Sequence, residues 1–225
     1  MRLIHLQIEL MFEYEFHSYS VSEQLYKELT GRTPRTVEHL EEPGVVIRSN
    51  KRKELVAWDK DSCSVVVESE LAPSNCFDRM VALLESVNKV APIGDLSERR
   101  LITHWLLPAN TYNFKSLERR YRETMMIQQP IWGKTVDSSV ILDTRIGNLT
   151  LHHQSGPMKP KQLREDFTIF KLDNIPNSFL FLWVSIHSKK MLKYSPTDVR
   201  DYLTSSFNHC ENHSRLFENI WGEMI

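Results

Sequence analysis

The sequence predicts an α+β protein of two halves, in which helices pack on one face of antiparallel sheets. Three observations predict this class. The first residues alternate in polarity, as the residues of a half-buried strand do. The apolar run at residues 178–187 is too short to span a bilayer and is typical of a strand buried on both faces. The amphipathic segment at residues 195–224 predicts a long helix that covers this strand's sheet.

In the N-terminal half, apolar residues share one parity from Leu6 to Phe16, which predicts a strand and not a signal peptide. Ser20 and Glu23 have the spacing of a capping box and predict a short helix. Residues 33–44 are typical of a polar connection. The remaining elements are predicted as strands at 45–48, 54–58 and 62–68, a helix that opens at 73, and a strand at 100–107.

This order of strand, helix, three strands, helix and strand is that of a ferredoxin-like layer with one added strand. A connecting helix is predicted at residues 113–126, and a hairpin turn at Gly147 and Asn148. The strands expected around that turn and after it are 138–146, 149–154, 166–172 and 178–187. Ser195 and Pro196 are the cap and the first residue expected for the last helix.

The composition is that of an ordinary globular protein, with 41% apolar and 25% charged residues. A net charge of −1 gives no overall attraction to nucleic acid or to an anionic membrane, so such a partner would need a local patch. Three cysteines without a CxxC pair argue for a reducing compartment and against a disulfide framework. We expect a cytoplasmic protein without membrane association. Its predicted parts are 1–110, 111–133 and 134–225, namely the N-terminal half, a connecting helix with a break, and the C-terminal half.

Signatures of catalysis and of cofactor binding are missing from the sequence. No serine lies on a glycine-flanked turn, and no cysteine opens a helix near a histidine. The seven glycines form no Gly-rich loop before a helix that could cradle a phosphate. We therefore predict no catalytic residue, no cofactor and no metal site.

Two histidine pairs are the candidates that could contradict this prediction. His209 and His213 are four residues apart on a predicted helix and could meet a metal, but Cys210 stands where a zinc peptidase has its glutamate, and no third ligand is near in sequence. A packing or surface role is the alternative. His152 and His153 end a hairpin strand and face opposite ways, so one ring at most could act as an acid or base.

Basic residues gather at one turn and on one predicted helix, and they are our candidates for contacts with nucleic acid. The alternative is a set of solvated surfaces that nearby acidic residues balance. These candidates are Arg48, Lys51, Arg52, Lys53, Arg119, Arg120 and Arg122.

Large apolar residues beside a predicted chain break are our candidates for a protein interaction surface. The alternative is that they form the seam between the two halves. These residues are Met125, Met126, Ile131 and Trp132.

Three stretches of sequence together resemble a sporadically distributed family of uncharacterised bacterial proteins. They are QIELMF at residues 7–12, RLITHW at 100–105 and HSRLFE at 213–218. Members of that family have two α+β halves and end in a helix of this kind. The family has no established catalytic residues, so the resemblance implies no site. It implies a patchy bacterial distribution, which is typical of mobile or defence-associated genes.

Three hypotheses of function follow. The first is a non-enzymatic accessory subunit of a bacterial multiprotein complex, for example in antiphage defence, that works through contacts with another protein subunit. The second is an RNA- or DNA-binding protein, or a ferredoxin-like ribonuclease, that uses local basic patches. The third is a metallohydrolase centred on His209 and His213.

Overall fold

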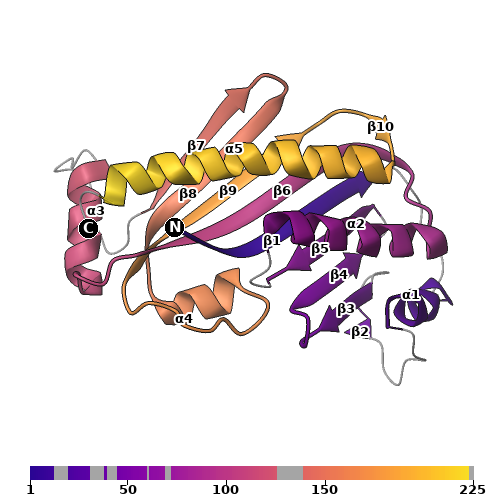
Figure 1. Ribbon diagram of the computed structural model, residues 1–225, viewed down its shortest axis with the longest axis horizontal. Coiled ribbons are helices and arrows are strands. Elements are labelled where there is room, and N and C mark those ends of the chain that lie inside the picture. The colour runs from indigo at the N-terminus through magenta and orange to yellow at the C-terminus, as the bar shows by residue number, and fades with distance from the viewer. Residues whose placement is uncertain are drawn as a thin grey trace. The chain divides into compact units, whose positions relative to one another are not determined.

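The computed structural model shows an α+β protein with an antiparallel sheet, which confirms the predicted class at this level (Figure 1). It describes residues 1–12, 20–30, 38–39, 45–59, 61–68, 72–125 and 139–222. The strands are β1 (Arg2–Phe12), β2 (Glu38–His39), β3 (Val45–Ser49), β4 (Glu54–Trp58), β5 (Ser62–Val67), β6 (Asp95–Pro108), β7 (Val140–Ile146), β8 (Leu149–Met158), β9 (Phe179–Ser188) and β10 (Leu192–Lys193). The helices are α1 (Ser20–Thr30), α2 (Pro73–Val90), α3 (Phe114–Met125), α4 (Pro160–Gln162) and α5 (Pro196–Gly222).

Hydrogen-bonded strands follow the order β2-β3-β4-β5-β1-β6-β9-β8-β7, and β10 pairs with β6. The pairs β1·β5, β2·β3, β3·β4, β4·β5, β7·β8 and β6·β10 are antiparallel. The apolar run of the sequence forms β9, which lies between β6 and β8 and buries residues on both of its faces. The prediction of an internal strand at this position is therefore confirmed.

Contacts divide the chain into two compact units. Unit 1 consists of Met1–His5, Ile102–Ile186 and His209–Ile225, and unit 2 of Leu6–Leu101 and His187–Asn208. The strands β1, β6 and β9 and the helix α5 each contribute residues to both units. The boundaries of these units differ from the domain boundaries predicted above. The predicted boundaries concern parts that fold independently, and they remain a prediction.

In unit 2, helix α2 packs on strands whose apolar residues alternate as the sequence predicts. Leu6, Ile8 and Leu10 of β1 are buried, whereas Gln7 and Glu9 between them are only partly buried. The apolar face of α2 lies against β5, beside β1 (Figure 1). The buried residues of α2 are Cys76, Phe77, Met80, Leu83, Leu84 and Val87. The expected alternation is thus confirmed as far as Phe12, and the residues to Phe16 lie outside the described part of the chain.

In unit 1, a cluster of apolar side chains joins β1, β6, β8 and β9 to the segment after α4. Phe179 and Phe181 of β9 are fully buried in it, and Phe167 lies 4.7 Å from Phe181 between ring centroids. The buried members of the cluster are Ile4, Leu106, Met158, Leu163, Leu172, Phe179 and Phe181.

Helix termini follow the capping residues of the sequence. The Asn113 side chain accepts a hydrogen bond from the backbone N–H of Ser116 at 2.9 Å, at the start of α3. The Ser195 hydroxyl accepts one from the backbone N–H of Asp198 at 3.4 Å, and Pro196 is the first residue of α5. The predicted helices at these two positions are confirmed.

The strand predicted at residues 166–172 is wrong. A π-helical turn at Leu163–Phe167 follows α4, and residues 168–172 form no ladder with another strand. Phe170 and Leu172 are buried while Lys171 is exposed, which imitates the alternation of a strand. Here this pattern arises because two apolar side chains of an irregular segment are both buried. The two-residue strand β2, in a region predicted as a connection, was also missed.

Candidate functional site

The turn between β3 and β4 presents the first group of predicted basic residues. Ser49 pairs with Glu54, so the residues between them form the turn. The Ser49 hydroxyl accepts a hydrogen bond from the backbone N–H of Arg52 at 3.4 Å. Lys53 has a φ of 53°, the left-handed conformation that returns the chain into β4. Lys51 and Arg52 are exposed on this turn, whereas Lys53 is half-buried.

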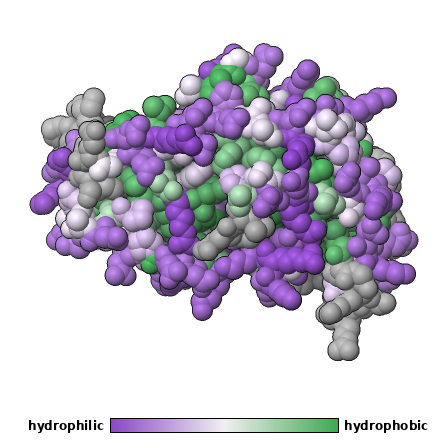
Figure 2. Space-filling view, viewed as in Figure 1, coloured by the Kyte–Doolittle hydropathy of each residue, from purple (hydrophilic) through white to green (hydrophobic). Residues whose placement is uncertain are grey.

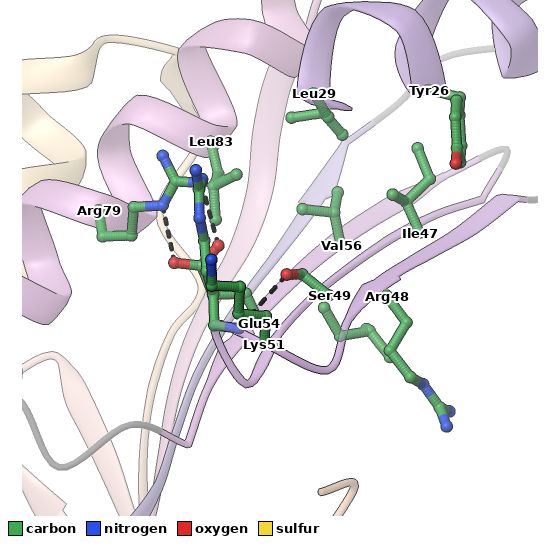
Figure 3. Close-up of a pocket in the computed structure, with 12 residues that line it drawn as sticks. Tyr26, Leu29, Ile47, Arg48, Ser49, Lys51, Glu54, Val56, Arg79 and Leu83 are labelled. Carbon is green, nitrogen blue, oxygen red and sulfur yellow. Dashed lines mark hydrogen bonds and ion pairs between the residues drawn. The ribbon is translucent and has the colours of Figure 1, made fainter. Parts of the chain in front are cut away.

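An open pocket of about 330 Å³ lies in unit 2 between this hairpin and the helices α1 and α2 (Figure 3). Its apolar wall consists of Leu29, Ile47, Leu55, Val56 and Leu83. The volume falls within the range of about 300–1,000 Å³ that is common for small-ligand pockets. The pocket therefore has the size of a small-ligand site, with one apolar wall.

The polar lining of the pocket is mainly basic. Its cationic side chains are Arg48, Lys51, Arg52 and Arg79, and Glu54 is the one carboxylate among the described lining residues. Figure 3 shows Arg79 and Tyr26 on opposite sides of the apolar wall, and the Arg48 side chain directed away from that wall. Three of the seven predicted nucleic-acid contacts, Arg48, Lys51 and Arg52, thus line one pocket, although the Arg48 side chain points away from the apolar wall (Figure 3).

An ion pair between β4 and α2 fixes one wall of the pocket. The Arg79 guanidinium donates from Nε to Glu54 Oε1 at 2.8 Å and from Nη2 to Oε2 at 3.0 Å. This two-bonded geometry holds both side chains in one orientation. The Glu54 side chain is 10% exposed and that of Arg79 is 31% exposed, so the guanidinium remains reachable from the solvent. Arg79 and Tyr26 are not among the residues predicted from the sequence, because their approach to the turn depends on how the helices pack.

The second predicted basic group lies on α3, in unit 1. Arg119 and Arg120 are exposed, and Arg122 is half-buried. Because the pocket belongs to unit 2, we treat the two groups as separate surfaces. The predicted role of the α3 group in nucleic-acid contacts remains a prediction.

The predicted interaction residues are mostly outside the described part of the chain. Met125 ends α3 and is half-buried, whereas Met126, Ile131 and Trp132 lie outside the described residues. The accessory-subunit hypothesis therefore remains a prediction.

Unit 1 brings together one histidine from each pair predicted in the sequence, His153 and His213. His153 Nδ1 lies 2.7 Å from His213 Nε2, and His153 Nε2 lies 2.6 Å from the Ser155 hydroxyl. The Tyr121 hydroxyl donates to the backbone carbonyl of Ser155 at 2.8 Å, and its oxygen lies 2.8 Å from Ser155 Oγ. Trp221 stacks on Tyr121 with ring centroids 5.1 Å apart.

One arrangement of protons satisfies this network. With the Tyr121 proton on the Ser155 carbonyl, the Ser155 hydroxyl can donate to the Tyr121 oxygen. Nε2–H of His153 can then donate to Ser155 Oγ and Nε2–H of His213 to His153 Nδ1, and both rings are neutral. Burial accounts for this state: it lowers the pKa of His153 to about 4, with the nearby His213 as a second cause, and it also lowers the pKa of His213. Burial likewise raises the pKa of Tyr121 to about 12.

The order of serine, histidine and histidine resembles that of a nucleophile, its base and an orienting group. However, Ser155 is 1% exposed and His153 is 4% exposed, so a substrate cannot reach the hydroxyl. We therefore assign this network to the packing of α5 and α3 against β8. The packing role that the sequence favoured for His213 agrees with this geometry.

Metal binding gains no support from the described part of the chain, where no group of three or more His, Cys, Asp and Glu side chains could hold an ion. His213 Nε2, which a metal at the predicted pair could have used, faces His153 instead. None of the three cysteines forms a disulfide, and all three are buried.

Comparisons with known proteins give no family: no protein-family model matches the chain, and no curated protein matches it. Among the described helices, none is long and apolar enough to cross a membrane.

Proposed function

We propose that this protein binds single-stranded nucleic acid through the basic pocket of unit 2. The observation that carries the proposal is that Lys51 and Arg52, two cations of one turn, lie at a pocket with an apolar wall. The cations would contact phosphates, and the wall would receive an unstacked base. A duplex keeps its bases stacked inside, so a pocket of this kind favours a single strand.

The charge distribution supports an anionic ligand. The net charge of the whole chain is −1, so long-range attraction does not explain binding, and a local excess of cations is required. The turn at the pocket supplies that excess, because Lys51 and Arg52 remain after Arg79 is paired with Glu54, the one carboxylate among the described lining residues. Glu54 is already paired with Arg79 through both oxygens, which reduces its repulsion of a phosphate.

The test is fluorescence anisotropy with a labelled single-stranded oligonucleotide, as RNA and as DNA, over a range of salt concentrations. We expect binding at low salt with a linear fall of log affinity against log salt concentration. Substitution of Lys51→Ala and Arg52→Ala together should reduce that slope by about 1.4, since each phosphate contact with a single strand contributes about 0.7. The affinity should fall roughly tenfold or more.

The matched control is Arg119→Ala with Arg120→Ala, which removes the same charge from exposed positions on α3. The proposal requires this control to bind almost as wild type does. Absence of binding at low salt would end the proposal, and an equal loss in both double variants would show non-specific attraction instead.

The proposal concerns unit 2 alone. A ferredoxin-like arrangement of the halves and a ribonuclease activity would extend it, but neither is needed for binding. The accessory-subunit hypothesis is a separate proposal, because contacts with another protein subunit would not require the basic pocket.

A further inference from the structure

Strand β7 ends the path of hydrogen-bonded strands and has one strand neighbour, β8, within the described residues. An edge strand presents backbone N–H and C=O groups that can pair with another strand. Proteins commonly block such edges with proline, with a bulge or with a row of charges. The seven residues of β7 contain neither proline nor glycine, and every one of them has a directly opposed partner on β8.

The side chains of β7 are unusually exposed for apolar residues. Ile141 is 58% exposed and Leu142 is 52% exposed, although they are neighbours that point to opposite faces of the sheet. Figure 2 shows apolar side chains at the surface of the projecting β7–β8 hairpin. Both faces of this edge would therefore gain from a partner that covers them.

We propose that β7 pairs with β7 of a second copy of this chain, antiparallel and about a two-fold axis, with Thr144 opposite its own copy. In an antiparallel pair, directly opposed residues point to the same face of the sheet, whereas neighbours in one strand point to opposite faces. A two-fold axis between two copies of one strand must therefore place one residue directly opposite the same residue of the other copy. With Thr144 at the axis, Asp143 lies opposite Arg145 of the second copy, and Arg145 lies opposite Asp143. Leu142 lies opposite Ile146 in both directions.

The charges select this register over its neighbours. With Asp143 at the axis, more residues would pair, but the two carboxylates would lie opposite each other, which is destabilising. With Arg145 at the axis, two guanidinium groups would meet. Only the Thr144 register gives opposite charges and apolar side chains across from one another, and a Thr–Thr pair at the centre is favourable.

The surroundings of Asp143 fit this arrangement. Its Oδ1 atom is 2.8 Å from His152 Nδ1 of the same chain, and the side chain is 68% exposed, so the carboxylate can receive a second donor from the outer edge. Ile141 would lie diagonal to Arg145 of the second copy, within reach of the alkyl part of that side chain. A single pair of short strands is a small interface, so the association should depend on protein concentration.

The test is sedimentation equilibrium of the whole chain over a series of concentrations. Wild type should shift from the 26.5 kDa of one chain towards twice that mass as the concentration rises. Asp143→Arg and Arg145→Asp should each weaken the dimer by about tenfold or more, because each places two like-charged pairs across the axis. The two changes combined should restore the wild-type dimer, since they exchange the charges without altering the register.

A wild-type protein that stays at the mass of one chain at every concentration overturns the proposal. The register would be overturned if both single variants had the dimer dissociation constant of the wild type. It would also be overturned if the combined variant dissociated as readily as the single variants. Thermal denaturation of each variant separates these outcomes from misfolding, because all substitutions are at exposed positions and should leave the transition in place. The inference is independent of the proposed nucleic-acid binding, since β7 lies in unit 1 and the pocket lies in unit 2.

Discussion

Replacement of His153 by glutamine should reduce the acid sensitivity of the fold. His153 is 4% exposed and its folded pKa is lowered to about 4, compared with 6.5 for an ordinary histidine. The unfolded chain therefore binds the proton more tightly than the folded protein does. The contribution of the neutral His153 ring to the free energy of unfolding is fully present above about pH 6.5. It is lost as the pH falls towards about 4.

The magnitude follows from that difference. Each pKa unit corresponds to about 1.4 kcal/mol, so the wild-type protein should lose about 3 kcal/mol through His153 over this pH window. At neutral pH, His153→Gln should be less stable than wild type by about 1–3 kcal/mol, because the bonds to Ser155 and His213 are disturbed. Since the amide does not titrate, the deficit should shrink or reverse at acid pH.

The assay is urea denaturation, followed by tryptophan fluorescence, at several pH values between about 7 and about 4. His209→Gln, which changes a histidine of the same helix outside the network, is the control and should keep the wild-type dependence on pH. His213 also has a lowered pKa, so His153→Gln should retain part of the acid sensitivity. An identical loss of stability with pH in wild type and His153→Gln would refute the reasoning.

Three further predictions concern other parts of the chain. Leu203→Asp should abolish the cooperative thermal transition, because residue 203 is 0% exposed on α5 and an unpaired buried charge costs several kcal/mol; a retained transition would contradict the packing of α5. Glu54→Gln should raise the affinity for an oligonucleotide about two- to threefold at low salt, since it removes the carboxylate beside the basic side chains, and a lower affinity at unchanged thermal stability would contradict this reasoning. Cys63 and Cys210, whose pKa burial raises to about 12, should not react with a thiol reagent in the native protein at neutral pH and should react after denaturation; rapid native labelling at either position would show that the thiol is accessible.

Local signals were sufficient to predict most elements. The period of two in β1 and the run of residues 178–187 identify strands, because side-chain direction alternates along any strand. Ser195 and Pro196 locate the start of α5, because a cap acts within one helical turn. The same locality explains the failure at residues 166–172, where Phe170 and Leu172 alternate with Lys171 although the segment pairs with no strand.

The sites were harder to predict because their members are distant in sequence. His153 and His213 are 60 residues apart, and Glu54 and Arg79 are 25 apart. Neither contact can be predicted from the spacing of the residues in the sequence, because each depends on which helix packs against which strand. The basic cluster at residues 50–53 could be predicted from the sequence. The pocket beside it could not, because Leu29 of α1 and Leu83 of α2 complete the apolar wall and no local pattern connects those helices to the turn.

The most direct measurement of the central claim is photo-cross-linking of a bound single-stranded oligonucleotide, followed by mass spectrometry of the linked peptides. The account predicts links on the peptides of α1 and of the β3–β4 turn, at Tyr26 and near Lys51 and Arg52, because these side chains line the pocket. These links should disappear in the Lys51→Ala and Arg52→Ala double variant. Links confined to α3, at Arg119 and Arg120, would contradict the account.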